Sequence, residues 1–197
     1  MIIKRAIFFL TRLFFKIFFK AEVRGIENIP SNEPLIIASN HISNYDPPAI
    51  LSFASLKRDE IYVVAKEELF KNKIFGYFLK QMGAIPIDRK NPQISSIKKS
   101  IEILRNKKTL LIFPEGTRRK EKDINPKDGI SFIAYKTGAK IIPVKISIVK
   151  NNSKLGKIII VFDKPISFER HSFYGRQTLK EISKKIIEKI YSINVES

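Results

Sequence analysis

The chain has no cysteine and no tryptophan, and it has only two histidines. The absence of cysteine excludes a disulfide scaffold, a cysteine nucleophile and thiolate metal sites. Two histidines, His41 and His171, are too few for a histidine cluster that holds a metal. Any imidazole chemistry must therefore use one of these two side chains.

Glycine-rich phosphate loops are also missing from the chain. It holds 8 glycines, and no two of them stand two residues apart, so it has neither a Gly-x-Gly-x-x-Gly run nor a Walker loop. A Gly-x-Ser-x-Gly nucleophile elbow is absent as well. These absences argue against a nucleotide-binding α/β protein and against a hydrolase that uses a serine nucleophile.

Acidic residues are few, with 19 Asp and Glu against 37 Lys and Arg, which gives a net charge of +18. Such a charge favours an acidic partner: nucleic acid, an anionic membrane or a phosphorylated substrate. With 44% hydrophobic residues in 197, the chain is a single globular domain with a core and not a disordered polycation. No zinc finger, RNA-binding motif or basic zipper accompanies the charge, so we expect no nucleic acid, although a nucleic-acid binder stays the alternative.

The first twenty residues contain five basic residues and no acidic one. Their longest uncharged stretch, 6–11, is too short for a membrane span of about 20 residues, and bulky aromatics stand where a signal peptide needs small residues. On a helical projection, most basic and most apolar side chains occupy separate sectors, as in interfacial helices. We therefore expect 1–23 to be an amphipathic membrane-docking helix and 24–197 the globular domain. The alternative is a helix that folds back on the core.

Apolar runs of strand length alternate with helical patterns along the rest of the chain. Strands are expected at 34–39, 61–65, 84–88, 109–114, 141–149 and 157–163. Helices are expected near 48–56, 66–81, 94–104, 127–137 and 179–190. This alternation predicts an α/β fold whose mixed, mostly parallel central sheet is flanked by helices. In such folds the functional residues follow the carboxyl ends of the strands.

A histidine and an aspartate follow the first expected strand. Asp46 stands five residues after His41, and Pro47 biases it away from helical geometry, so a turn can bring the carboxylate to the imidazole. A carboxylate on one ring nitrogen fixes the tautomer and leaves the other nitrogen as a base. The alternative is a pair that only caps the turn and the next helix.

The strand expected at 109–114 runs into Pro-Glu-Gly-Thr-Arg. This segment puts a glycine, whose backbone N–H can point at a ligand, between a carboxylate and a guanidinium. Arg118, and Arg89 after an earlier strand, can hold a phosphate by forked hydrogen bonds. A single arginine at such a place is usually a solvated surface charge. Several of them at one sheet edge favour a phosphate site.

Four segments together resemble the motifs of the glycerolipid acyltransferases, in particular the bacterial 1-acylglycerol-3-phosphate acyltransferases. They are 40–46, 83–89, 113–118 and 142–144, and the resemblance covers about 24–165. It implies that His41 is the general base and Asp46 its orienting carboxylate. It also implies acceptor-binding roles for Lys66, Arg89, Glu115, Gly116, Thr117 and Arg118.

The resemblance implies transfer of a fatty acyl group to the sn-2 hydroxyl of 1-acylglycerol 3-phosphate, or lysophosphatidic acid, giving phosphatidic acid in phospholipid biosynthesis. The donor would be a thioester of acyl carrier protein or coenzyme A, with no metal or cofactor needed because the thioester is already activated. An amide near Gly116 is the candidate oxyanion donor. We expect a peripheral enzyme on the cytoplasmic face of the cell membrane, bound to anionic lipids. A membrane-associated scaffold with an inactive site is the remaining alternative.

Overall fold

The computed structural model of the chain describes residues 2–87, 92–116, 128–149, 156–167 and 175–195. Helices and strands alternate along most of the described chain, as the sequence predicts. The helices are α1 (Ile2–Phe18), α2 (Asp46–Ala54), α3 (Lys73–Gln81), α4 (Pro92–Arg105), α5 (Gly129–Thr137) and α6 (Arg176–Ser192). The strands are β1 (Glu22–Arg24), β2 (Leu35–Ser39), β3 (Ile61–Lys66), β4 (Ala84–Ile87), β5 (Thr109–Ile112), β6 (Lys140–Val149) and β7 (Lys157–Phe162).

The described strands form one sheet in the order β1-β7-β6-β2-β5-β3-β4. Strands β2 to β6 run parallel to one another, whereas β7 is antiparallel to β6 and carries β1 on its outer edge. The mixed, mostly parallel sheet that the sequence predicts is therefore confirmed. All five residues of β2 are buried, as expected of a central parallel strand covered on both faces.

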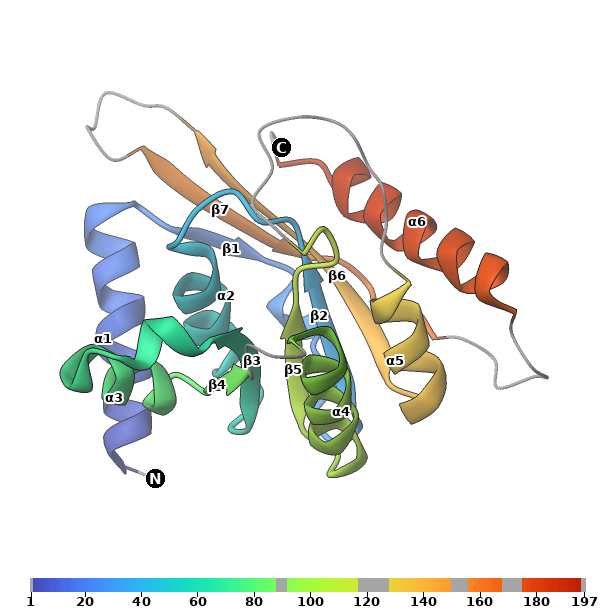
Figure 1. Ribbon diagram of the computed structural model, residues 1–197. Helices are drawn as coiled ribbons and strands as arrows, with labels where there is room; N and C mark the ends of the chain where they lie inside the picture. The colour runs from blue at the N-terminus through green and yellow to red at the C-terminus, as the bar shows by residue number, and fades with distance from the viewer. Residues whose placement is uncertain (1, 88–91, 117–127, 150–155, 168–174, 196–197) are drawn as a thin grey trace.

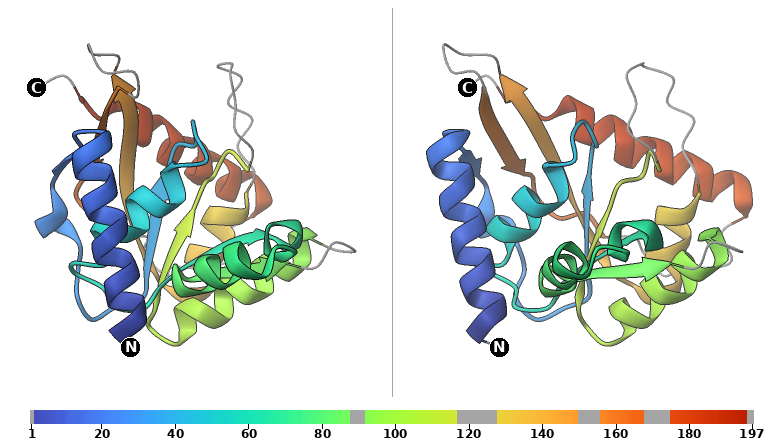
Figure 2. Two further views of the ribbon diagram at one scale, coloured as in Figure 1. Left: turned by 90° about the vertical axis from the view of Figure 1, so that its left-hand side faces the viewer. Right: turned by 60° about the vertical axis from the view of Figure 1, so that its left-hand side comes forward.

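Helices cover both faces of the sheet (Figure 1). On one face, α1 and α2 pack with α3 beside them around a core that includes Phe15, Leu35 and Leu51. On the other face, α4, α5 and α6 enclose a second core that includes Ile36 and Leu104. The turned views in Figure 2 show the sheet between the two groups of helices. The strand ends between these layers are where a site can form.

The amino-terminal helix α1 packs on the domain with one face and exposes apolar side chains on the other. Phe8, Phe15 and the following Phe19 are buried in the first core. Arg12 Nη1 donates to Ser52 O of α2 and to Oγ of Ser55, which follows α2, each at 2.8 Å. The exposed apolar face of α1 consists of Ile2, Ile3, Phe9, Leu10, Leu13, Phe14, Ile17 and Phe18. No helix of the described ranges has both the length and the hydropathy of a membrane span.

The helix expected at 66–81 is wrong in its extent, because the segment is broken in two. A 3₁₀ turn covers Glu67–Phe70, and α3 begins only at Lys73. Asn72 caps α3, since its side-chain oxygen accepts the N–H of Phe75 at 3.0 Å. The two pieces lie so close that a Cβ on Gly76 would stand 2.9 Å from the Phe70 carbonyl oxygen. Lys73 and Ile74, at the start of α3 after this bend, are exposed.

A buried arginine holds together the loops at the amino edge of the sheet. Arg58 is only 6% exposed, and its Nε donates to Thr109 Oγ1 at 2.8 Å. Its two terminal nitrogens donate to the carbonyl oxygens of Pro30, Glu33 and Lys107 at 2.8 to 3.0 Å. Each donor thus replaces the water that the buried guanidinium has lost. This edge is fixed by a structural clamp, which leaves the carboxyl edge for chemistry.

Candidate active site

The candidate site lies where β2 and β5 end side by side. Ala38 of β2 pairs with Ile112 of β5, and the same residue pairs with Pro143 of β6 on its other side. The segments that leave these strands therefore meet at one carboxyl edge. Residues 40–46 and 113–116, which the sequence analysis identifies as motif segments, both lie at this edge.

The imidazole of His41 and the carboxylate of Asp46 are in contact, with 2.8 Å between Nδ1 and Oδ2. The His41 side chain is 18% exposed, whereas that of Asp46 is 1% exposed. Asp46 Oδ2 also accepts the backbone N–H groups of Ile42 at 2.6 Å and Ser43 at 2.7 Å. The carboxylate therefore anchors the turn and orients the imidazole at the same time. With Nδ1 engaged, Nε2 is the nitrogen that can exchange a proton with a ligand.

Two further residues of the motif segments fix this arrangement. Phe113 stacks on the His41 ring, with 4.2 Å between ring centroids and 23° between the planes. Asn40 is buried and holds β2 to β6, since its side chain donates to Ile146 O and accepts Ile146 N, both at 2.9 Å. The sequence shows both residues beside the expected site, but it does not show the ring stacking, because that contact joins segments 72 positions apart.

The turn after β5 uses the glycine that the sequence singles out. Gly116 has φ of 73°, and its N–H donates to Phe113 O at 3.0 Å. The Gly116 amide therefore closes the turn, so the expected oxyanion role cannot belong to this N–H in the present conformation. Glu115 Oε1 accepts a hydrogen bond from the Tyr191 hydroxyl at 2.5 Å. Sequence reasoning missed Tyr191, which lies on α6 and belongs to no motif.

The remaining predicted substrate-binding residues are only partly described. Lys66 is exposed at the carboxyl end of β3. Arg89, Thr117 and Arg118 lie outside the described residues, as does His171. The roles of all these residues stay predictions.

Gly83 and Pro86 of the second motif segment occupy places that suit their residue types. Gly83 has φ of 84°, and a Cβ there would stand 2.1 Å from the Ile61 carbonyl oxygen. Only glycine allows this close approach of the backbone to β3. Pro86 lies in β4, which forms the edge of the sheet, where a missing N–H leaves the ladder intact.

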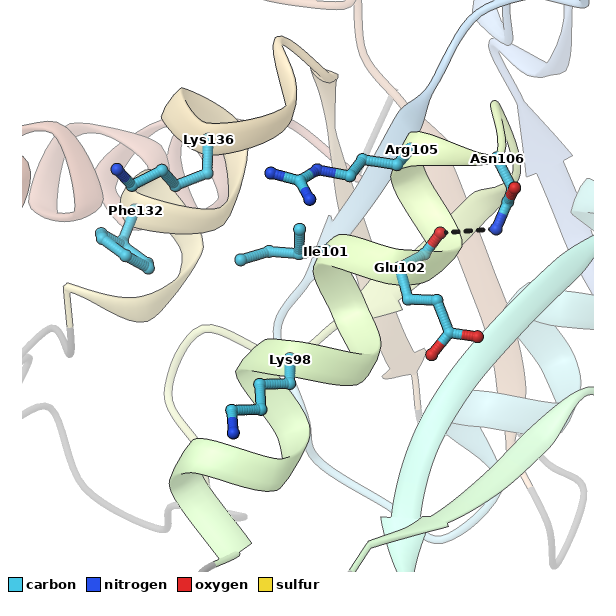
Figure 3. A pocket seen from close by; sticks show the side chains of 7 residues that line it. All are labelled: Lys98, Ile101, Glu102, Arg105, Asn106, Phe132 and Lys136. Atoms are coloured by element: carbon cyan, nitrogen blue, oxygen red, sulfur yellow. Dashed lines mark hydrogen bonds between the residues drawn. The ribbon is translucent and has the colours of Figure 1, made fainter.

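A separate hollow lies between α4 and α5, on the face of the sheet opposite α2 (Figure 3). None of the motif residues that the structure describes lines it. Its lining residues are Lys98, Ile101, Glu102, Arg105, Asn106, Phe132 and Lys136. The candidate site is therefore defined by the His41 and Asp46 pair and not by this hollow.

A protein-family model described as acyltransferase matches residues 20–147, which include all the motif segments. The chain belongs to the acyltransferase family. The region that this acyltransferase model matches contains His41, Asp46 and Phe113 but ends before Tyr191.

Curated relatives in this acyltransferase family come from bacteria and plants. The 1-acyl-sn-glycerol-3-phosphate acyltransferase of Bacillus subtilis is 36% identical over 148 residues, which cover 74% of this chain and 73% of the relative. The enzyme of the same name from Borreliella burgdorferi is 30% identical over 190 residues, which cover 89% of this chain and 74% of the relative. The chloroplastic enzyme BAT2 of Brassica napus is 30% identical over 76% of this chain, but the chain spans only 46% of that relative.

A solved acyltransferase structure shares the fold. The crystal structure of the 1-acyl-sn-glycerophosphate acyltransferase PlsC from Thermotoga maritima superposes with a TM-score of 0.71 at 24% identity. The match covers 98% of this chain and 81% of that one. It therefore includes α1 and α6, which flank the region that the family model matches.

The double role of Asp46 predicts a large loss of stability when its carboxylate is removed. Asp46→Ala leaves two backbone N–H groups without their acceptor, so the free energy of unfolding should fall by about 2–4 kcal/mol. Urea denaturation measures the change. The matched control is Asp59→Ala, since that carboxylate is 69% exposed and forms an exposed ion pair with Arg5 at 3.3 Å. The control should lose less than about 1 kcal/mol, and equal losses would contradict the role of Asp46 as an anchor.

Proposed function

We propose that the protein is a 1-acylglycerol-3-phosphate O-acyltransferase. In this reaction a fatty acyl group passes from an acyl thioester to the sn-2 hydroxyl of lysophosphatidic acid, and phosphatidic acid is formed. The observation that carries the proposal is the contact of His41 with the buried Asp46 at the edge where the motif segments meet. The relatives from Bacillus subtilis and Borreliella burgdorferi are 1-acyl-sn-glycerol-3-phosphate acyltransferases, which supports the choice of acceptor.

In the proposed mechanism His41 Nε2 takes the proton of the acceptor hydroxyl as the hydroxyl oxygen attacks the thioester carbonyl carbon. Asp46 stabilises the imidazolium that forms. When the tetrahedral intermediate collapses, the carbon–sulfur bond breaks and the imidazolium returns its proton to the leaving thiolate. The products are an ester and a thiol, and no acyl-enzyme is formed. The donor is a thioester of either acyl carrier protein or coenzyme A.

The general-base role predicts a severe kinetic loss for His41→Ala. Acyl transfer should fall by at least about 10²-fold, because positioned proton transfer contributes about 10² to 10⁴. The measurement is thiol release from an acyl thioester in the presence of lysophosphatidic acid. His171→Ala, the other histidine of the chain, is the control and should keep the wild-type rate.

Two outcomes would contradict this proposal. A folded His41→Ala protein with near-normal turnover would show that another group takes the proton. Salt-sensitive retardation of DNA, without turnover in the wild type, would favour the nucleic-acid binder that the charge of +18 also permits.

We further propose that Arg89 and Arg118, with Lys66, Glu115, Gly116 and Thr117, bind the phosphorylated acceptor. Arg89→Ala and Arg118→Ala should then raise KM for lysophosphatidic acid by about 10- to 100-fold and change kcat less, since each removes a charge-assisted pair. Steady-state kinetics with varied acceptor measures this. Arg105→Ala is the matched control, because Arg105 lines the hollow on the opposite face. Unchanged acceptor KM in both variants would place the phosphate elsewhere.

The exposed apolar face of α1 supports membrane docking as part of the proposed function. Ile2 is 84% exposed and Leu10 and Ile17 are 60% exposed, although the helix is seated on the domain. The neighbouring α3 adds Ile74, 85% exposed, and exposed lysines stand on both elements. Apolar side chains rimmed by cations suit the surface of an anionic bilayer. We place the protein on the cytoplasmic face of the cell membrane as a peripheral enzyme.

Charged substitutions on this face should abolish docking without unfolding the protein. Removal of the whole helix is unsuitable as a test, because Phe8, Phe15 and Phe19 belong to the core. The double variant Leu10→Glu/Ile17→Glu should lose sedimentation with phosphatidylglycerol vesicles and keep transfer to a short-chain, water-soluble acceptor. High salt should weaken wild-type docking only in part, because the apolar contribution is not screened.

The matched control adds the same two charges to the exposed start of α6, as Gln177→Glu/Thr178→Glu. This control should sediment like the wild type. If the α1 variant also sediments like the wild type, this face does not enter the bilayer.

A further inference from the structure

The carboxyl end of α6 brings an aromatic residue to the sheet edge that carries the candidate site. The Tyr191 hydroxyl donates to Glu115 Oε1 at 2.5 Å. The ammonium nitrogen of Lys145, from β6, lies 3.8 Å from the centre of the Tyr191 ring. Burial lowers the pKa of Lys145, and the Glu115 carboxylate opposes that shift. Tyr191 thus contacts a cation through its ring and a carboxylate through its hydroxyl.

This end of α6 is held firmly by its neighbours. Ile186 and Ile190, which precede Tyr191 on α6, are each 1% exposed in the second core. Lys189 forms an ion pair with Asp163 at 2.9 Å. Burial alone would raise the pKa of Asp163, but its hydrogen bonds with Lys189 and the next backbone N–H bring it below the usual value. A side chain on such a fixed helix end can hold a partner in place.

The partner of Tyr191 lies in the same tight turn as the aromatic ring that supports His41. Phe113 and Glu115 are two residues apart, and the N–H of Gly116 closes the turn on Phe113 O. Phe113 stacks on the imidazole, whereas Glu115 contacts α6. A displacement of Glu115 therefore displaces the ring against which the imidazole rests, because the closed turn moves as a unit.

We infer that Tyr191 is a positioning residue for His41, acting through Glu115 and the turn at 113–116. The inference rests on the proposed function for its kinetic consequence. It assigns a role to α6, which lies outside the region that the family model matches. It also gives Glu115 a structural partner in addition to its predicted role in acceptor binding.

The test replaces Tyr191 by Phe, which keeps the ring beside Lys145 and removes the hydroxyl. We expect kcat to fall about tenfold with little change in the donor KM, since loss of one hydrogen bond to a charged group misplaces the base. Tyr191→Phe should lower kcat less in the Glu115→Gln variant than in the wild type, because Glu115→Gln already weakens the hydrogen bond that Tyr191→Phe removes.

A second readout needs no activity. The chain has two histidines, so the ring protons of ¹³C-labelled His41 are assigned by comparison with His171→Gln. The Phe113 ring shifts these protons in the wild type, and Tyr191→Phe should move them.

The matched control is Tyr62→Phe at the opposite end of the sheet. The Tyr62 hydroxyl lies 3.4 Å from Glu60 Oε1, and Lys108 Nζ lies 5.4 Å from the ring centre, so the chemistry is similar. This variant should change neither kcat nor the His41 resonances, and the thermal midpoints of both variants report any general loss of stability.

Each combination of results decides between the hypotheses. Unmoved His41 resonances in folded Tyr191→Phe would overturn the inference, whether or not kcat falls, and so would moved resonances with unchanged kcat. If the wild type transfers no acyl group but the resonances move, the positioning role stands and the proposed function fails.

Discussion

The candidate site depends on one buried carboxylate. Asp46 Oδ2 gathers three donors, while its Oδ1 is buried with no hydrogen-bond partner among the described residues. Asp46 lies in the first turn of α2, where the positive end of the helix dipole favours a negative charge. A positive charge that develops on His41 compensates the carboxylate further. The position of the imidazole is therefore tied to the packing of α2 in the first core.

The sheet edge carries different chemistry on its two sides. Phe113 packs against the first core and stacks on His41. Lys145 stands in β6 between Val144 and Ile146, which belong to that core, so its side chain points to the other face of the sheet, where it contacts Tyr191 of α6. The turn that ends in Gly116 is the place where the two sides meet. The contact of Tyr191 with Glu115 on the α6 side can consequently affect the stacking of Phe113 on His41 on the α2 side through this turn.

Much of this arrangement follows from the sequence, and what does not has a physical reason. Apolar runs predict the central strands because parallel strands buried on both faces must be apolar throughout. The short β1 has a single apolar residue and escapes this pattern. The break before Asn72 was missed because the local period suits one helix, while the close approach at Gly76 is a tertiary contact. The pair of Tyr191 with Glu115 spans 76 positions and leaves no local signal.

The amino-terminal helix shows why periodicity could not choose between core and membrane. A buried stripe containing Phe8 and Phe15 and an exposed one containing Phe9 and Phe18 share α1, so apolar side chains occupy two sectors of the helix. The packing of α1 against α2 and α3 separates the two stripes. The buried stripe fixes the orientation of the exposed one relative to the sheet, because both belong to one rigid element. Any bilayer that receives the exposed stripe therefore meets the domain in a defined orientation, with Tyr45 of the segment between His41 and α2 in ring contact with Phe19.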